Sequence, residues 1–426
     1  MTIVFISFIV FLLIGMPVAF AIGIAGVFFF LQYPMLPFTM TIQLLVSQTQ
    51  NSALLAIPLF VLAANLLNAC GISEKLLKLA TQLTGHMIGG LAQVGIVLST
   101  LMGGVSGSAT ADAAMQARIL GKDMIARGYA RGYVASNLAW SSLITATLPP
   151  GIGIILYGTV GEVSIGRLFA AGLFVGLFLM VVFMIAVRIT SKRLDYKPER
   201  VEMASFKEIM HSLKETIWAL LFPLMLLIGI RFGMFSISEI GAFAVFYALF
   251  VGLFVYRVLN FTNFLESLRN AVVDIGAIMF IIAMSGIFGY GIPFERVPQR
   301  ITDSFLGVTT EPILLLFMIV GFLFLIGLFV EGSVLIILLT PIFLPLVRSV
   351  GIDPVVFGLI FCTTITASLN TPPVGISMFA VNSILGASLG EYLRHSLPWL
   401  LVVLVTLTFM IFFPGAVLFL PNFFFG

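Results

Sequence analysis

Long runs of apolar residues follow one another along almost the whole chain, separated by short polar segments. The runs lie at 3–31, 52–70, 133–157, 165–187, 216–235, 237–256, 271–292, 354–369 and 396–420. Most can cross a hydrocarbon core about 30 Å thick, since a helix rises about 1.5 Å per residue. The pattern predicts an all-α polytopic membrane protein. Residues 1–31 are expected to form one retained helix, because no cleavage motif follows them.

The composition supports this fold class and excludes others. Of 426 residues, 60% are hydrophobic and 9% are charged, and the mean hydropathy is +1.18, which is too apolar for a soluble protein. Cys70 and Cys362 lie in separate segments and the three histidines lack ligand spacing, so neither a disulfide nor a metal centre is expected. The absence of a metalloprotease, nucleophile-elbow or P-loop motif argues against a membrane-embedded enzyme.

The positive charges indicate how the chain is oriented. If the basic loop 188–214 is cytoplasmic and the crossings alternate from it, 16 of the 21 Lys and Arg residues face the cytoplasm and 5 face outside. This bias agrees with the positive-inside rule. The loop itself is interpreted as a solvated connection.

One segment is too short for a full crossing. Residues 88–102 give only about 15 apolar or small positions, roughly 22 Å of helix, before the polar stretch GGVSGSATADAA at 103–114. Basic residues at Arg118 and Lys122 follow within two turns, so the chain is expected to return to its side of entry. A re-entrant hairpin is therefore predicted at about 88–120.

A second segment has the same character. Residues 313–347 contain two apolar arms separated by Glu331-Gly332-Ser333. The segment is too long for one crossing and too short for two. A second re-entrant hairpin is therefore predicted at about 313–347.

A proline pair interrupts the apolar helix that follows each hairpin. Pro149-Pro150 lies in the predicted helix at about 133–158, and Pro372-Pro373 lies in the one at about 354–385. Proline breaks a helix and frees backbone carbonyls. Non-helical backbone at membrane depth must line protein or a wet cavity, so the hairpins and broken helices together imply a polar site near the midplane.

The two halves of the chain share this order of features. The proline pairs are 223 residues apart, and Gly107-Ser108 precedes Gly332-Ser333 by 225. We expect a first repeat in 1–215, which includes the loop 188–214, and a second in 216–426, which begins with a connecting helix at 216–235. That extra helix inverts the second repeat. Inverted repeats around a midplane site are typical of secondary transporters. The small and hydroxyl residues of the tips supply oxygen ligands for Na⁺, and helix N-termini there favour an anion.

These residues resemble the large membrane (permease, DctM-like) subunit of the tripartite ATP-independent periplasmic (TRAP) transporters. The matching motifs are SGSATADAA at 106–114, PPGIGIILYG at 149–158, LLTPIFLPLVRSVGIDPVVFGLI at 338–360 and TPPVG at 371–375. The resemblance implies an elevator-type transporter of the bacterial inner membrane that imports an organic acid anion with Na⁺ as coupling ion and no other cofactor. It also implies two partners, a small four-helix DctQ-like subunit and a periplasmic substrate-binding protein.

The resemblance assigns site residues as follows. One sodium site would use Ser106 and Thr110 with backbone around Thr145, Leu148 and Pro150, and the internal repeat places a second at Gly327 and Glu331 with backbone around Ser368, Thr371 and Pro373. The substrate would lie between Ser108, Asp112, Gly332, Ser333 and Asn370, with Phe294 and Arg296 nearby.

The chain departs from the family pattern at several of these positions. Relatives usually carry Ser in place of Gly151 and Asp in place of Glu331, and an Asn and a Gly appear replaced by Thr364 and Ser368. Phe294 occupies the position of an arginine. The substrate therefore stays open among C4-dicarboxylates, sialic acid, sulfonates and other small organic acids.

Alternative interpretations accompany these assignments. Asp112 is either a helix cap or a functional carboxylate. Glu331 is either ion-linked or part of a structural ion pair, since a charge at membrane depth is costly. The chain could also be a self-sufficient Na⁺/carboxylate symporter that needs no binding protein. A passive channel has no need for two inverted hairpins.

Overall fold

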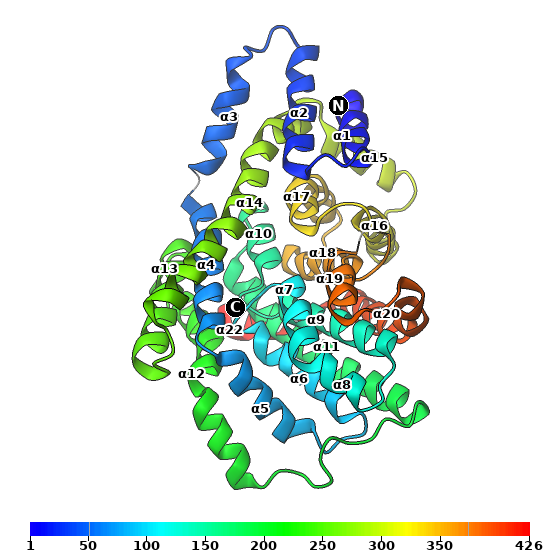
Figure 1. Ribbon diagram of the computed structural model, residues 1–426. Coiled ribbons are helices and arrows are strands. Elements are labelled where there is room, and N and C mark those ends of the chain that lie inside the picture. The colour runs from blue at the N-terminus through cyan, green and yellow to red at the C-terminus, as the bar shows by residue number, and fades with distance from the viewer. Residues whose placement is uncertain (51, 374) are drawn as a thin grey trace.

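The structure is a computed structural model that describes residues 1–50, 52–373 and 375–426, and every regular element in these ranges is a helix (Figure 1). The first half contains α1 (Thr2–Leu13), α2 (Val18–Gln32), α3 (Thr39–Thr49), α4 (Ala56–Ala69), α5 (Ile72–Thr84), α6 (Gly90–Gly103), α7 (Ala109–Gln116), α8 (Lys122–Ala126), α9 (Arg131–Thr147), α10 (Ile152–Val160) and α11 (Ile165–Arg193). The all-helical fold class is confirmed.

The second half begins with a long helix that follows the loop after α11. It contains α12 (Phe206–Arg231), α13 (Ile237–Phe250), α14 (Phe261–Phe294), α15 (Val297–Leu306), α16 (Pro312–Gly327), α17 (Gly332–Ser349), α18 (Pro354–Ser368), α19 (Ile376–Leu385), α20 (Leu389–Phe412), α21 (Pro414–Val417) and α22 (Phe419–Phe425).

Several of these helices have the length and composition of membrane spans. Within the described residues, six helices are each long and apolar enough to cross a membrane. The number rises to eight if each of two bent helix pairs counts as one span. The pairs are α4 with α5, bent by 70°, and α9 with α10, bent by 43°.

The apolar run at the N-terminus is not one helix, so that prediction is wrong. α1 ends at Leu13 and α2 begins at Val18. Gly15 adopts a φ of +84°, in the left-handed region, and Pro17 precedes α2. Glycine enters this conformation freely, and Pro17 is extended, with a ψ of +135°, so these two residues divide the run.

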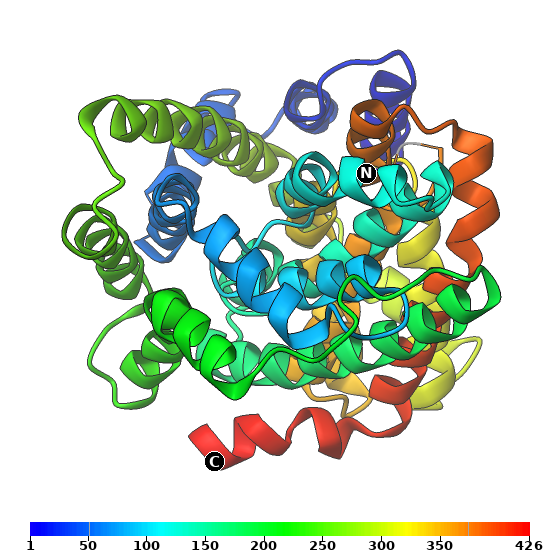
Figure 2. The same ribbon diagram turned by 60° about the horizontal axis from the view of Figure 1, so that its bottom comes forward.

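The helices pack as two groups. In the first, α14 lies along α2, α3 and α4, and α13 packs on α4. In the second, α9 contacts α6, α7 and α20, while α18 contacts α16 and α17. Figure 2 shows the green α13 and α14 on the left and the yellow and orange helices on the right.

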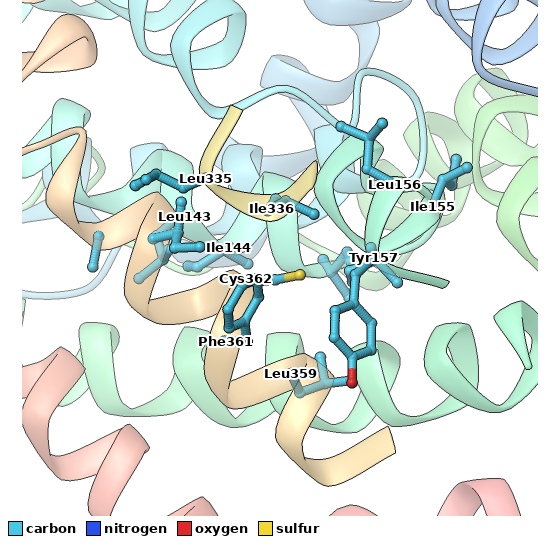
Figure 3. Packing of buried hydrophobic residues seen from close by; sticks show 14 of the residues in the cluster. Leu143, Ile144, Ile155, Leu156, Tyr157, Leu335, Ile336, Leu359, Phe361 and Cys362 are labelled. Carbon is cyan, nitrogen blue, oxygen red and sulfur yellow. The ribbon is translucent and has the colours of Figure 1, made fainter. Parts of the chain in front are cut away.

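The second group has a continuous apolar core that joins both halves of the chain. Side chains of α9, α10, α17 and α18 meet there, among them Leu143, Tyr157, Ile336 and Phe361 (Figure 3). The Tyr157 ring fits only because residue 358 is glycine, since a Cβ on Gly358 would lie 2.3 Å from a ring carbon. The Tyr157 hydroxyl donates to the Pro354 carbonyl at 2.8 Å. This core fixes α10 of the first half against α17 and α18 of the second.

Candidate functional site

Four interruptions in helical structure define the candidate site. α9 and α10 are separated by residues 148–151, and α18 and α19 by residues 369–375. Each of these breaks contains a proline pair joined by a cis peptide bond, Pro149-Pro150 and Pro372-Pro373. The other two interruptions are the tips at 104–108, between α6 and α7, and at 328–331, between α16 and α17.

The first tip packs directly on the first break. Gly107 has a φ of +62°, and a Cβ on it would lie 2.3 Å from the Pro150 carbonyl oxygen. The backbone amide of Ile152 donates to the Gly107 carbonyl at 3.3 Å. Only glycine meets both the conformational and the steric requirement here. The sequence therefore brings tip and break together at this residue.

Serine, not aspartate, caps the helix that leaves this tip. The Ser108 hydroxyl accepts a hydrogen bond from the Ala111 amide at 3.4 Å and is the N-cap of α7. The interpretation of Asp112 as the cap is therefore wrong. Asp112 lies one turn inside α7.

Asp112 is the centre of a buried polar cluster. Its side chain is 1% exposed, and its Oδ2 accepts hydrogen bonds from Ser99, Gln116 and Thr145, each at 2.8 Å. Because three donors converge on one oxygen, the cluster suits an ionised carboxylate. Thr145 came from the resemblance, but Ser99 and Gln116 were missed. The sequence does offer a signal for Gln116, because Asp112 and Gln116 are four residues apart and therefore lie on one helix face.

The other residues of the first sodium site implied by the resemblance lie at the first tip, on α7 and at the first break. Ser106 is buried at the tip, and its amide donates to the Met102 carbonyl at 2.8 Å. The Thr110 hydroxyl lies 3.0 Å from that of Ser377, on α19. Leu148 fills the space left by Gly103 and Gly176, where an added Cβ would meet its side chain. The structure thus brings the first tip, the first break and the second half together.

The second tip is built differently. Glu331 is the N-cap of α17, and its carboxylate accepts from the Val334 amide at 3.2 Å and from the Ser333 hydroxyl at 3.0 Å. Neither alternative from the sequence included this capping role. Gly327 lies against Ser368, because a Cβ there would be 2.2 Å from the serine hydroxyl. Gly332 lies against Ile365, because a Cβ on Gly332 would be 3.2 Å from a methyl carbon of that side chain.

The second break holds the other predicted residues. Ser368 donates to the Ile365 carbonyl at 2.6 Å, and Thr371 to the Ala367 carbonyl at 3.4 Å. Asn370 is fully buried, and within the described chain neither polar atom of its side chain has a hydrogen-bond partner. Pro373 is exposed. Asn370 therefore has free hydrogen-bonding capacity at this break.

Phe294 and Arg296 belong to a different neighbourhood. The Phe294 ring packs on Phe29 and Tyr33, with centroids 5.4 and 5.1 Å apart. Arg296 adopts a φ of +51° at the start of α15. The Tyr33 hydroxyl donates to Glu295 at 3.1 Å, which raises the pKa of Tyr33. The structure shows these residues in contact with α2 and α15.

The sequence did not anticipate a cavity between the two helix groups. It has a volume of about 370 Å³ and is bounded by α3, α10, α14 and α17. Polar residues that line it include Gln48, Thr159, Glu162 and Ser285. These residues come from three separate helices or their ends and share no sequence motif that would have grouped them.

Comparison with known proteins identifies the family. Residues 5–416 match the family described as "Tripartite ATP-independent periplasmic transporter, DctM component". The chain is 32% identical to the 2,3-diketo-L-gulonate TRAP transporter large permease protein YiaN of Escherichia coli, covering 95% of each chain. It is 33% identical to the sialic acid TRAP transporter large permease protein SiaM of Vibrio cholerae, covering 97% of this chain and 96% of that protein.

A solved structure shares the fold. The YdaH transporter of Alcanivorax borkumensis superimposes with a TM-score of 0.66 over 88% of both chains, at 15% identity. The family match and the relatives agree with the resemblance seen in the motifs. The chain is a multi-pass membrane protein and a transporter permease subunit rather than an enzyme, and it belongs to the DctM family of TRAP transporter large permease subunits.

Proposed function

We propose that this chain imports a small organic acid anion across the bacterial inner membrane, driven by Na⁺ and supplied by a periplasmic binding protein. Relatives named for sialic acid, isethionate and C4-dicarboxylate transport support an anionic substrate. The isethionate relative is named DctMQ, which supports a small DctQ-like membrane subunit as a second partner here.

The observation that carries the proposal is the meeting of two tips and two breaks. Gly107 packs on Pro150, Thr110 contacts Ser377, and Gly327 packs on Ser368. Helix ends and freed carbonyls at membrane depth are the elements from which transporters build ion and substrate sites.

We place one Na⁺ at the first tip and one at the second. The first would take the hydroxyls of Ser106 and Thr110 with carbonyls around Thr145, Leu148 and Pro150. Asp112 accepts three hydrogen bonds within its own buried cluster, so we place it outside the substrate site.

The second ion would lie at Gly327 and Glu331, with carbonyls around Ser368, Thr371 and Pro373. The anion would bind between Ser108, Gly332, Ser333 and Asn370. Asn370 offers an amide that is buried and lacks a partner within the described residues. The N-terminus of α17 begins at Gly332 and favours a negative charge.

An elevator movement would carry this site across the membrane. In this proposal the group with α9, α10, α17 and α18 moves as the transport core, and the group with α2, α3, α4 and α14 is the scaffold. The cavity of about 370 Å³ lies between these two groups, where such a movement would take place. The inverted relation of the two repeats would make the inward and outward positions equivalent.

Sodium coupling also fits the energetics. Moving one positive charge inward gains about 2.3 kcal/mol per 100 mV of membrane potential. Two Na⁺ with one monoanion carry a net positive charge inward, so both the ion gradient and the potential favour uptake.

The test is uptake into proteoliposomes that contain this chain and its small subunit. Purified binding protein and a panel of labelled organic acids are added with an inward Na⁺ or K⁺ gradient. We expect uptake of at least one acid only with both Na⁺ and the binding protein. Equal uptake in K⁺ would refute sodium coupling, and uptake by this chain alone would favour the self-sufficient symporter.

A further inference from the structure

Behind the first tip, a row of buried polar side chains continues past Asp112, away from the proposed ion and substrate sites. On α9, Asn137, Ser141 and Thr145 follow one another at intervals of four residues, so they share one face. All three are fully buried. Gln116 of α7 faces the same row from the opposite side and is also fully buried.

The hydrogen bonds of Gln116 fix the direction of its amide. Its Nε2 donates to Asp112 Oδ2 at 2.8 Å and also to Ser99 Oγ. The carboxylate oxygen can only accept here, so the nitrogen must point toward it. Gln116 Oε1 therefore points away from Asp112, and within the described chain it has no hydrogen-bond partner.

A second amide oxygen points to the same place. A Cβ built on Gly95 of α6 would lie 3.3 Å from Gln116 Oε1 and 3.6 Å from Asn137 Oδ1. Neither polar atom of the Asn137 side chain has a partner among the described residues. The unpartnered Gln116 oxygen and the unpartnered Asn137 amide thus converge, beside a Leu138 methyl group, on the space that the missing side chain of Gly95 leaves open, and a cation there would take the oxygen end of each amide.

The charge of Asp112 favours a cation in this space. The salt bridges found within the described residues do not include Asp112. A proton on Asp112 Oδ1 would have no acceptor there, because that atom is unpartnered as well. A water molecule would satisfy the amides but would leave a buried negative charge uncompensated, which is costly.

We propose that Gly95, Gln116 and Asn137 form a buried site for a monovalent cation of the size of Na⁺, with Asp112 as its charge partner. The site goes beyond the two tip sites of the proposed function. Hard oxygen ligands with a single carboxylate suit Na⁺ better than a divalent cation, which usually takes more than one carboxylate. Gly95 is required because a methyl group there would occupy the space between the oxygens.

Equilibrium binding of radioactive Na⁺ to the full chain in lipid nanodiscs tests this site. Gly95→Ala should reduce the number of Na⁺ ions bound per chain by one. Asn137→Asp adds a carboxylate and should tighten one Na⁺ site by about tenfold. Gly276→Ala is the matched control, because Gly276 is also helical and has open space at its Cβ position.

The outcomes separate this site from the tip sites. Ser106→Ala combined with Thr110→Ala should lose a different ion and keep this one. If Gly95→Ala binds as many ions as the unmodified chain and Asn137→Asp tightens none, the space holds a buried water only and the inference is wrong. If transport proves independent of Na⁺ but Gly95→Ala still loses one ion, the inference stands and the proposed function fails.

Discussion

The side-chain hydroxyls of Thr110 and Ser377 lie 3.0 Å apart, although the two residues are separated by 267 positions in the chain. Thr110 belongs to the helix that leaves the first tip, and Ser377 to the helix that follows the second break. The contact joins the tip region of the first half to the break region of the second. A change on either side should therefore be felt at both proposed ion sites.

Removing the hydroxyls of the first tip should weaken Na⁺ dependence. In Ser106→Ala combined with Thr110→Ala, two oxygen ligands are lost, so the Na⁺ concentration for half-maximal uptake should rise by about tenfold or more. Uptake measured against Na⁺ concentration checks this. Ser383→Ala is the control, because that exposed hydroxyl on α19 bonds only its own helix. Unchanged Na⁺ activation in the double variant would remove the first ion site.

Replacing Asp112 by asparagine should remove the buried negative charge while keeping the size and shape of the side chain. In Asp112→Asn the amide oxygen can take the place of Oδ2 and keep its donors, while the nitrogen replaces the unpartnered Oδ1. We expect the chain to fold and its Na⁺ affinity to fall by about tenfold or more. Ser99→Ala loses a hydrogen bond but keeps the charge, so its effect on Na⁺ affinity should be smaller. The reverse order would show that geometry rather than charge matters.

The two roles of Glu331 can be separated by substitution. Asp and Asn are both good N-caps, whereas only Asp carries a charge. Glu331→Asp should keep both stability and Na⁺ dependence, and Glu331→Asn should keep stability alone. Glu331→Ala should also lose about 1 kcal/mol through the missing cap. Thermal unfolding and Na⁺-dependent uptake are measured in parallel, and Na⁺ activation of Glu331→Asn equal to that of Glu331→Asp would confine this residue to capping.

A methyl group on residue 107 should disrupt the packing of the first tip on Pro150 at the first break. Gly107→Ala combines a left-handed backbone with a Cβ 2.3 Å from the Pro150 carbonyl, so transport should be lost and the unfolding temperature should fall. Gly128→Ala shares the positive φ, at +89°, but has open space around it. It should show only the conformational cost of about 1 kcal/mol. Equal effects of the two changes would mean that contact with Pro150 is unimportant.

The sequence was informative wherever a residue constrains the backbone by itself. The proline pairs marked the positions at which α9 and α18 end, because two adjacent prolines remove two successive backbone donors, whereas the single prolines Pro223 and Pro398 lie inside helices. Gly15 and Pro17 carried the same information about the N-terminal run, but the average hydrophobicity of that run obscured it.

The contacts of individual side chains were much harder to predict. Asp112 is next to Ser99 and Thr145 only because three helices pack there, and no local pattern specifies that packing. The cap formed by Glu331 depends on the position at which α17 begins, and sequence places helix ends within a few residues at best. The space beside Gly95 is defined by side chains of two other helices.

The fit of the Tyr157 ring against Gly358 has a consequence for movement. Because the Tyr157 ring of α10 occupies the place of a side chain on α18, sliding one of these helices past the other would create a steric clash. We therefore expect α10 and α18 to travel as one stiff body, with bending confined to the connections between this body and the rest of the protein.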